Sequence, residues 1–504
     1  MNFATAAKKI GNTTLTENGA VAYNTTSSNL LDLFSIIGAM RTRTEEEIIQ
    51  KFSAAFAEDK LLATKMLFYC GNIRGGLGER RTFRICLKWL ANNYPSIVKA
   101  NLKFIPHFNR WDSLFSLVGT PVENKMWDFI AITLKSDMDE CIAASLDNRD
   151  AHISLLAKWM PSENASSKKT KELARKAISR LGVAPKAYRQ ILTNLRSQLN
   201  IVETQMSSGD WNNICYAKVP AYAMKNYRNA FRNHNLEGFN RYVESLSKGE
   251  TKINASTLYP YDIVRSYMSK LPQYGWMWHN SFPALDTEDA ILEAQWKALP
   301  NYVDDENNVL VMADVSGSMY GQPLYSSIGL ATYFAERNSG DYKNLYMTFT
   351  NDPHFIALNE NSNLLTNLQK VMKTDMGYST NLDKAFTYIL FHATMNGVSA
   401  EELPKALVVI SDMEIDPYFR GSKGFDFLET QKRKFEANGY KLPKLILWNV
   451  ESRQDTYLTQ SEDVILVSGQ SASTFKNLIS SINVGAYGMM LNTLNDKMYD
   501  CITI

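Results

Sequence analysis

One carboxylate and two hydroxyls follow a short apolar run in the C-terminal half of the chain. The run is VLVMA, residues 309–313, and the side chains are those of Asp314, Ser316 and Ser318, at alternate positions. Carboxylate and hydroxyl oxygens are the ligands of hard divalent cations such as Mg²⁺, which prefers an octahedral shell at about 2.0–2.1 Å. The spacing therefore indicates a loop that can bring several oxygen atoms to one ion.

Two further polar positions belong with this loop. Thr380 stands in GYSTNLDKAF just before an expected helix, and Asp412 directly follows the apolar run ALVVIS. We expect the hydroxyls of Ser316, Ser318 and Thr380 to bind the ion directly, while the aspartates Asp314 and Asp412 act through water or through the serines. Few charged groups then touch the ion, and one position stays open for an outside oxygen, typically a partner's carboxylate. The expected ion is Mg²⁺, or another divalent cation such as Mn²⁺ or Ca²⁺.

Hydrolysis is a competing interpretation of this predicted metal site. Two-metal hydrolytic sites use several bridging carboxylates with the ions about 3.5–4 Å apart. The predicted site has only two carboxylates and no histidine, so we expect a binding protein and not an enzyme. Glu414 and Asp416 follow Asp412 closely. Either carboxylate could fill the open position from within the chain, which would make the ion structural.

A second candidate site is the basic stretch, which we define as residues 168–196. Glu172 is its only acidic residue, while the formal net charge of the whole chain is only +2. Such local clustering of cations fits contacts with RNA phosphates, and Tyr188 could add a ring on which single-stranded bases stack. A solvated helix face without a partner is the alternative that the charges leave open. The basic residues are Lys168, Lys169, Lys171, Arg175, Lys176, Arg180, Lys186, Arg189 and Arg196.

A glycine- and arginine-rich segment, GNIRGGLGERRTFR, is a third feature. Gly75, Gly76 and Gly78 precede a helix that we expect to begin near Glu79. No strand comes before them, so the glycines are not a dinucleotide-binding fingerprint. We expect a tight turn between two helices whose amides could meet an anion. The arginines that could add RNA contacts are Arg74, Arg80, Arg81 and Arg84.

The candidate site residues must be positioned by the fold of the chain, and the chain shows two different hydrophobic patterns. From about residue 28 to 300, apolar residues recur at three- and four-residue spacing, which predicts stacked antiparallel helix pairs with degenerate repeats. After the polar linker NYVDDENN, short apolar runs alternate with helical stretches, which predicts a doubly wound α/β domain with a parallel sheet. We therefore predict domains at 1–300 and 301–504. The expected strands are 309–313, 344–349, 406–411, 444–450 and 463–468.

The placement of the metal motifs follows from this fold class. Ligands of doubly wound sheets bind at the carboxyl ends of the strands, where Asp314 and Asp412 are expected. In the helical half, IPHFNRWDSLFSL places Trp111 and Leu114 where they suit a helix core, and Arg110 could pair with Asp112. We expect this segment to serve packing.

Composition narrows the class of protein. Of the 504 residues, 45% are hydrophobic and 21% are charged, as in ordinary globular proteins. The five cysteines lie far apart without a CxxC pair, which excludes a disulfide framework and a zinc knuckle and favours a reducing compartment. No apolar run approaches the ~18 residues that span a bilayer, and the N-terminus has no signal-like segment. We expect a cytoplasmic protein with no membrane partner.

The metal motifs resemble a known family. Together, DVSGS at 314–318, Thr380 and Asp412 are similar to the metal-ion-dependent adhesion site of von Willebrand factor A domains. The resemblance covers about 306 to 485, and it implies a metal-binding A domain. This chain departs from the pattern at Ser411 and Met413, where many such domains have threonine and glycine.

The helical half resembles a second family. GGLGERRTFR and IPHFNRWDSLF, followed by an A-like domain, are similar to the TROVE module of Ro-type RNA-binding proteins. A closer match is an uncharacterised family of the same layout, through LAKWMPSE, YRQILTNLRSQLNIVETQMSSGDWNNICYAKVPAYAM and KINASTLYPYDIV. The resemblance implies HEAT-like helical repeats in a ring or horseshoe closed by the A domain. It also implies a ribonucleoprotein that binds small structured RNAs or single-stranded RNA ends.

Two functions remain in view at this stage. The first is a non-catalytic Ro-like protein that binds RNA through the basic stretch, with help from Arg80, Arg81 and Arg84. The second is a metal-dependent docking or assembly module, in which the ion captures an aspartate or glutamate of a protein partner and no RNA is bound.

Overall fold

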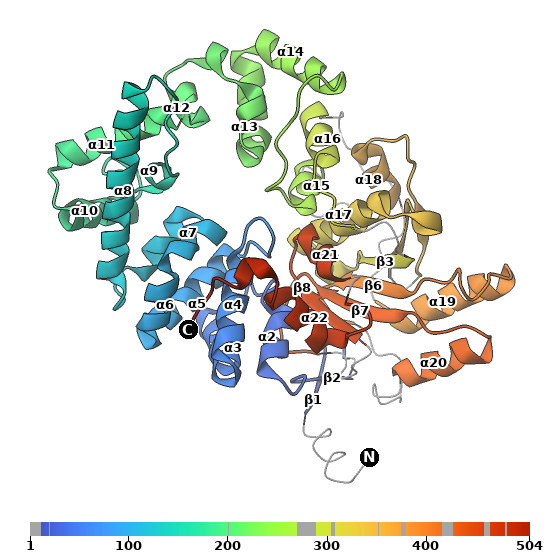
Figure 1. Cartoon of the computed structure of the whole chain (residues 1–504). Helices are drawn as coiled ribbons and strands as arrows, with labels where there is room; N and C mark the ends of the chain where they lie inside the picture. The colour runs from blue at the N-terminus through green and yellow to red at the C-terminus, as the bar shows by residue number, and fades with distance from the viewer. Residues whose placement is uncertain are drawn as a thin grey trace. The chain divides into compact units, whose positions relative to one another are not determined.

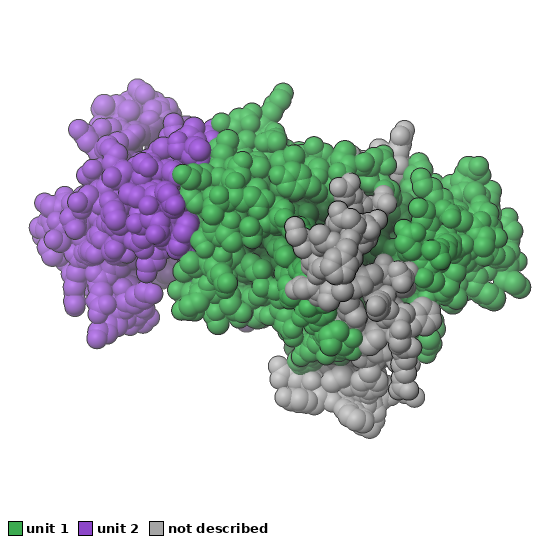
Figure 2. All heavy atoms as spheres, turned by 90° about the horizontal axis from the view of Figure 1, so that it is seen from below, with its two compact units in different colours: residues 1–82, 255–500 green, residues 83–254, 501–504 purple. Residues whose placement is uncertain are grey.

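The computed structural model describes residues 12–19, 21–199, 201–269, 289–303, 308–350, 352–373, 380–415, 427–457, 464–478 and 481–504. By their contacts, these residues form two compact units, coloured separately in Figure 2. Unit 1 joins Met1–Thr82 to Ala255–Asp500, and unit 2 joins Phe83–Asn254 to Cys501–Ile504. The predicted domain 1–300 thus contributes helices to both units. The division at 300 and 301 follows the sequence pattern, and it stays a prediction.

A mostly parallel sheet forms the centre of unit 1. Among the described residues it has six strands in the order β5-β4-β3-β6-β7-β8, and only β5 runs antiparallel to its neighbour (Figure 1). Five of the strands are buried along nearly their whole length, as expected for apolar runs in a parallel sheet. The strands are β3 (Val309–Asp314), β4 (Leu345–Phe349), β5 (Phe355–Ala357), β6 (Ala406–Ser411), β7 (Lys444–Asn449) and β8 (Val464–Ser468).

Helices cover both faces of this sheet, as Figure 1 shows. On one face, Leu310 of β3 shares a buried cluster with Phe386 of α19 and Phe435 of α20. On the other face, the ring of Phe475 in α21 lies 4.7 Å from that of Phe334 in α17. The expected combination of a helical part and an α/β part is confirmed. The helices are α17 (Gln322–Arg337), α18 (Leu364–Met372), α19 (Leu382–Met395), α20 (Phe427–Ala437), α21 (Phe475–Leu478) and α22 (Gly485–Leu494).

Unit 1 also contains helices from the predicted helical half. One continuous helical pattern, residues 45–70, is split in the structure because Asp59 accepts a hydrogen bond from Leu62 N at 2.8 Å and caps a new helix. α2 and α22 pack beside β8, and α15 packs against α17. A short antiparallel hairpin, β1 (Thr13–Leu15) and β2 (Val21–Tyr23), precedes them. The helices are α2 (Asn29–Ile36), α3 (Glu45–Glu58), α4 (Lys60–Gly71), α15 (Pro260–Met268) and α16 (Ala290–Lys297).

Unit 2 is helical throughout its described residues. Arg110 Nε donates to Asp112 Oδ1 at 2.9 Å and Leu114 is fully buried, which confirms the expected ion pair and core position. No described helix of the chain is both long and apolar enough to cross a membrane. Beginning with α5, which starts in unit 1, the helices are α5 (Arg80–Asn93), α6 (Pro95–Asn101), α7 (Ile105–Phe108), α8 (Glu123–Leu146), α9 (Leu156–Trp159), α10 (Lys168–Leu181), α11 (Pro185–Gln198), α12 (Val202–Ser207), α13 (Ala221–His234) and α14 (Leu236–Ser247).

Candidate metal site and basic helix

Asp314 lies at the carboxyl end of β3, the first strand of the sheet in chain order. The neighbours of β3 are β4 and β6, so the strand order reverses at this point. In doubly wound sheets, the crevice outside the strand ends at such a switch point is where ligands bind. The Asp314 side chain is fully buried, and its Oδ1 accepts a hydrogen bond of 2.9 Å from Ser316 N. This hydrogen bond closes the turn that leaves the strand.

Asp412 follows the neighbouring strand β6, and Ser411 links the two strand ends. Ser411 Oγ donates to Asp314 Oδ2 at 2.5 Å and accepts from Met413 N at 3.0 Å. Asp412 Oδ1 accepts from Glu414 N at 3.2 Å. The structure therefore brings the first and third of the predicted metal motifs together at one end of the sheet.

Met413 has an unusual backbone conformation beside Asp412. Its φ is 66°, in the left-handed region that costs a residue with a β-carbon roughly 1–2 kcal/mol. Such strain persists where surrounding structure holds it, and it concentrates at functional sites. Met413 thus has a backbone shape that glycine would adopt more easily.

Four side chains make up what we call the strand-end cluster, namely Asp314, Ser316, Ser318 and Asp412. The two serine Oγ atoms lie 3.3 Å apart. Asp412 is 2% exposed, and its Oδ2 has no hydrogen-bond partner among the described residues. Arg453 Nη1 lies 3.4 Å from that oxygen. A buried carboxylate oxygen without a donor is costly, so its position indicates where a cation would be favourable.

Thr380 lies beside the loop that follows Asp412. The Thr380 hydroxyl donates to Glu414 O at 3.3 Å, and its side chain is 1% exposed. The preceding residues 374–379 and the acidic candidate Asp416 lie outside the described residues. The carboxylate of Glu414 accepts a hydrogen bond from Glu17 N. Thr380 is thus placed near the strand-end cluster, and its role as an ion ligand stays a prediction.

Burial raises the proton affinity of both aspartates, and the charge of Asp412 adds to the effect at Asp314. Burial, and after it the charge of Asp412, raises the pKa of Asp314 to about 7. Burial also raises the pKa of Asp412, against the opposing charge of Arg453. Two carboxylates in one buried space repel when both are ionised. A divalent cation between them would remove this repulsion.

The donor set fits a hard divalent cation. The strand-end cluster offers two carboxylates and two hydroxyls, and the unpartnered Oδ2 of Asp412 gives the observation on which the fit rests. The described residues contain no group of three or more His, Cys, Asp or Glu side chains that could hold a metal. A hydroxyl-rich set with few charged ligands suits Mg²⁺ or Mn²⁺ better than Zn²⁺, which prefers nitrogen and sulfur.

Part of the basic stretch is already paired in the structure. Lys176 Nζ lies 2.9 Å from Glu123 Oε1, and Arg180 contacts the same carboxylate at 3.8 Å. Arg189 Nη1 lies 2.5 Å from Glu163 Oε2. The acidic partners come from outside residues 168–196, which is why the sequence of the stretch alone did not reveal them. These three cations serve helix packing in unit 2 before they serve any ligand.

Three of the remaining cations lie at the start of α10. Lys168, Lys169 and Lys171 lie in its first turn, which has no acidic residue. Positive charge is unfavourable at this end of a helix, because the backbone dipole is itself positive there. Lys168, Lys169 and Arg175 are exposed, and within the described part of the chain these three cations, Lys171 and Lys186 form no ion pair. Helix stability therefore does not explain this cluster.

Tyr188 and Arg196 are structural residues, and the expectation that Tyr188 stacks on bases is wrong. The Tyr188 side chain is 2% exposed, and its hydroxyl donates to Pro161 O at 2.7 Å. Arg196 donates to Ala157 O at 2.9 Å and to Met160 O at 2.8 Å. Both side chains hold the segment between α9 and α10 in place. A tyrosine on the apolar stripe of α11 packs inward, and the sequence already placed it on that stripe.

The glycine-rich turn between α4 and α5 forms as expected, but several of its amides are engaged. Leu77 N donates to Tyr69 O, Gly78 N to Asn72 O and Glu79 N to Cys70 O, at 2.8–3.1 Å. Asn72 Oδ1 accepts from two further amides of the turn. These five amides are not available to an anion, and anion binding by the rest of the turn stays a prediction.

The arginines after this turn differ in their partners. Arg81 Nη1 donates to Arg43 O at 2.8 Å, whereas Arg84 Nη2 lies 2.8 Å from Asp112 Oδ2. Arg80 and Arg81 belong to unit 1 and Arg84 belongs to unit 2. Arg80 is exposed and is the member of this set that keeps its charge available.

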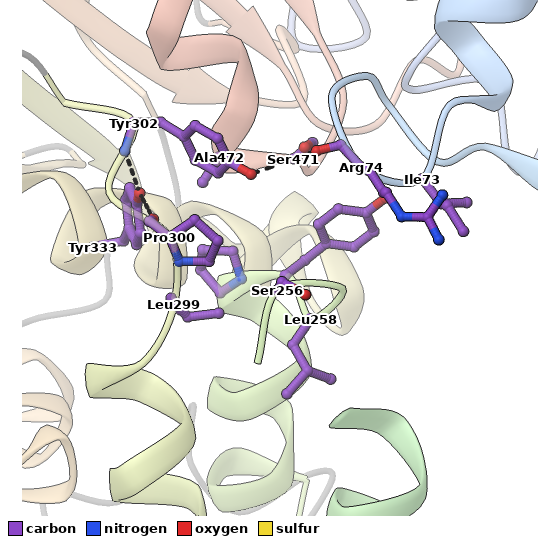
Figure 3. A pocket seen from close by; sticks show the side chains of 12 residues that line it. Ile73, Arg74, Ser256, Leu258, Leu299, Pro300, Tyr302, Tyr333, Ser471 and Ala472 are labelled. Atoms are coloured by element: carbon purple, nitrogen blue, oxygen red, sulfur yellow. Dashed lines mark hydrogen bonds between the residues drawn. The ribbon is translucent and has the colours of Figure 1, made fainter. Parts of the chain in front are cut away.

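A hollow near the same turn is a weaker candidate site. It encloses about 300 Å³, including open solvent. Tyr302 N donates to Tyr333 Oη, which donates to Pro300 O, so the polar groups drawn at one side already pair with one another (Figure 3). The Arg74 guanidinium points away from these residues in Figure 3. Nothing in the hollow converges on a ligand as the strand-end cluster does.

Two residues near the candidate metal site escaped the sequence analysis. Arg453 follows β7, whose carboxyl end lies at the same edge of the sheet, so its place after an expected strand was a usable signal. Glu17 comes from the hairpin and interacts with Arg453 at 3.5 Å. No local pattern in the sequence connects Glu17 to Arg453, which lies 436 positions later.

Comparisons with known proteins give a family and a viral relative. A family model described as a domain of unknown function (DUF2828) matches residues 16–110 and 124–309. A second model, also described as a domain of unknown function (DUF7788), matches residues 308–496. The uncharacterized protein L728 of Acanthamoeba polyphaga mimivirus is 31% identical over an alignment of 533 residues, which covers 98% of this chain and 89% of that protein.

Proposed function

We propose, from the geometry of the candidate metal site, that the protein is a non-catalytic, metal-dependent docking module. The chain belongs to the family of the DUF2828 domain of unknown function, so the family itself does not indicate a function. The strand-end cluster would hold Mg²⁺ or a similar divalent cation, to which Thr380 would add a third hydroxyl. The ion would present its open position to a carboxylate of a protein partner. The observation that carries this proposal is the Oδ2 of the buried Asp412, which accepts no hydrogen bond among the described residues and has an ion pair with Arg453 at 3.4 Å.

The absence of an enzymatic role is part of the proposal. Hydrolytic metal sites place several carboxylates around two ions about 3.5–4 Å apart. The strand-end cluster has two carboxylates, and the described residues around it contribute hydroxyls and Arg453. Hydroxyl ligands leave the ion with most of its charge, which favours capture of an anionic oxygen.

The finer fold description belongs to the same proposal. We take residues 301–504 as a von Willebrand A-like domain and the helical residues before them as a degenerate HEAT-like, TROVE-like array. The reversal of strand order at β3, with an aspartate at the strand end, supports the first description. All five cysteines are free thiols, which supports a reducing compartment such as the cytoplasm.

A pull-down from a cell extract tests docking with the full chain. A partner held by the ion should bind in Mg²⁺, survive nuclease, and be lost in EDTA or in Ser316→Ala. Ser399→Ala changes an exposed serine of the same unit and should retain the partner. A partner that stays bound in EDTA would contradict an ion-bridged contact.

RNA binding is the second candidate, and the cations at the start of α10 favour it. Lys168, Lys169 and Lys171 with Arg175 form a positive surface that helix stability does not explain. Such a surface would hold the phosphates of small structured or single-stranded RNA, with Lys186 and Arg80 as further candidates. Lys176, Arg180 and Arg189 would contribute only by giving up their acidic partners, and Arg81 and Arg84 only by releasing theirs.

Nucleic acid that co-purifies with the protein tests this second candidate. RNA binding predicts such material and an affinity that falls steeply with salt. Sequencing it would identify the ligand. A protein that purifies free of nucleic acid and shows no salt-sensitive binding to RNA would leave docking as the function.

A further inference from the structure

The tip of the N-terminal hairpin lies on the loop that carries Asp412. We define the hairpin tip as residues 16–18, between β1 and β2. Thr16 Oγ1 donates to Ile415 O at 2.7 Å, and Asn18 Nδ2 donates to Glu414 O at 2.6 Å. Glu17 N donates to Glu414 Oε2 at 2.5 Å. Three successive residues of the tip are therefore bonded to two successive residues of the loop.

Arg453 connects this tip to the strand-end cluster. Its Nη1 lies 3.5 Å from Glu17 Oε2 and 3.4 Å from Asp412 Oδ2. Its Nη2 donates to Ser318 O at 2.6 Å. One positive charge thus stands between a carboxylate of the hairpin tip and the buried carboxylate of the predicted ion site. In the absence of an ion, the guanidinium supplies the charge that both carboxylates require.

The hairpin is held in place beyond its tip. Tyr23 N donates to Tyr457 O at 2.8 Å, and Tyr457 N donates to Tyr23 O at 2.9 Å. Tyr23 is the last residue of β2, and Tyr457 follows the same sheet edge as Arg453. Thr16 is 4% exposed, whereas the Glu17 side chain is 55% exposed. The backbone of the tip is therefore held by hydrogen bonds, while the Glu17 carboxylate is exposed to solvent.

We propose that Glu17 is an internal ligand of the candidate metal site, and that the hairpin tip covers the ion until an outside carboxylate displaces it. The proposal rests on the proposed function, since it assumes an ion at the strand-end cluster. The carboxylate of Glu414 accepts a hydrogen bond from Glu17 N and so helps to hold the tip at the loop. When an ion binds between Asp412 and Glu17, Arg453 loses both of its carboxylate partners to the stronger charge.

The consequence for docking is a competition within the chain. A partner's aspartate or glutamate must replace Glu17 at the ion, so binding begins only when the tip leaves the loop. The hairpin tip would then act as a regulatory cover, and any change that weakens its three hydrogen bonds would make docking easier.

Mn²⁺ titrations of the full chain test the role of Glu17. Calorimetry should show binding at least about tenfold weaker in Glu17→Gln, since even the loss of a residue that only supports a metal ligand costs about 10–100-fold. Glu17→Asp keeps the charge but shortens its reach by one methylene, and it should weaken binding nearly as much. Glu46→Gln removes an exposed acid of the same unit and serves as the control, with affinity within twofold of wild type. Glu17→Gln that matches Glu46→Gln would overturn the proposal, and so would Glu17→Asp that matches wild type.

Hydrogen exchange gives an independent measurement of the cover. The amides of residues 16–18 should exchange more slowly in Mn²⁺ than in EDTA, and this difference should vanish in Glu17→Gln. Equal exchange in both conditions would overturn the proposal. Failure of the proposed metal site and failure of the proposed cover give different results. Mn²⁺ that does not bind wild type, or binds Ser316→Ala equally well, would refute the metal site itself, while Mn²⁺ bound independently of Glu17 would refute only the cover.

Discussion

The strand-end cluster of unit 1 and the first turn of α10 in unit 2 both gather like charges, but under different conditions. Asp314 and Asp412 are buried, and burial raises the pKa of each. Lys168 and Lys169 are exposed to water, which screens their repulsion at little cost. When both aspartates are ionised, the buried pair is therefore stabilised by a cation. The exposed lysines can bind an anion but do not need one for stability.

A buried acid of unit 2 sharpens this contrast. Burial alone would raise the pKa of Glu123, but hydrogen bonds from Gly119 N, Lys176 and Trp127 outweigh it and lower the pKa. Glu123 therefore has its compensating charge within the chain. Among the described residues, the cation beside the carboxylates of the strand-end cluster is Arg453, at 3.4 Å from one oxygen. This difference between Glu123 and the strand-end carboxylates supports the proposal of an added cation at the sheet edge.

Loss of cation-dependent stability is the largest expected effect. At a free Mg²⁺ concentration of a hundred times Kd, binding should stabilise wild type by about 2.7 kcal/mol. Asp412→Asn should lose this gain, and in EDTA it should be at least as stable as wild type because one repelling charge is gone. Thermal unfolding with and without EDTA measures both effects. If Mg²⁺ stabilised Asp412→Asn as much as wild type, the strand-end cluster would not depend on a cation, and its contrast with the first turn of α10 would fail.

Reversal of the free cations of α10 should have the next largest effect. If they bind RNA, Lys168→Glu, Lys169→Glu and Arg175→Glu together should lower affinity by about 2 kcal/mol or more. The slope of log affinity against log salt should fall by roughly 0.7–0.9 for each RNA phosphate that the variant no longer neutralises. Filter binding at several salt concentrations gives both values. The matched triple change Arg241→Glu, Lys248→Glu and Lys252→Glu, elsewhere in unit 2, should leave affinity nearly unchanged, and an equal loss there would indicate only nonspecific attraction.

The stability of the metal-free protein should fall as pH rises. The pKa of Asp314 is near 7 in the folded chain, above the usual value of 3.8. Between these pH values the folded state binds more protons than the unfolded state, so the free energy of unfolding decreases with pH, by up to about 1.4 kcal/mol per pH unit. Urea unfolding in EDTA from pH 5 to 8 measures the slope. In Asp314→Asn the slope over this range should be shallower, and an unchanged slope would assign it to other groups.

Removal of the Tyr188 hydroxyl should have the smallest effect. Tyr188→Phe loses the hydrogen bond to Pro161 O and should cost about 1 kcal/mol of stability. Because the ring is buried, RNA affinity should not change. Urea unfolding with RNA titration of the same variant measures both quantities. A loss of RNA affinity without a loss of stability would restore Tyr188 as a stacking residue.

Sequence patterns predicted the elements of unit 1 better than its contacts. The continuous apolar runs gave β3, β4, β6, β7 and β8 within one or two residues, since buried parallel strands need such runs. β5 has only three residues, too few to show a pattern. The positions of Asp314 and Asp412 followed from the strand ends, which is why the strand-end cluster was predictable.

The partners of charged residues were not predictable, because they depend on contacts between distant segments. Lys176 and Arg180 share Glu123, which lies more than fifty residues earlier on another helix. Glu17 meets Arg453 across most of the chain. Tyr188, Leu192 and Leu195 recur at four- and three-residue spacing, the pattern of a buried helix face, and all three are buried. Charge clusters read from sequence therefore need the tertiary contacts before they can be assigned a ligand.

Electron paramagnetic resonance of Mn²⁺ tests the central claim most directly. The double variant Ser316→Ala and Ser318→Ala removes two predicted ligands and leaves both aspartates in place. Wild type is predicted to bind one Mn²⁺ per chain and to release it to excess Mg²⁺, whereas the double variant is predicted to leave the free Mn²⁺ signal unchanged. Equal binding by the two proteins, or none by wild type, would contradict a cation held at the end of the sheet.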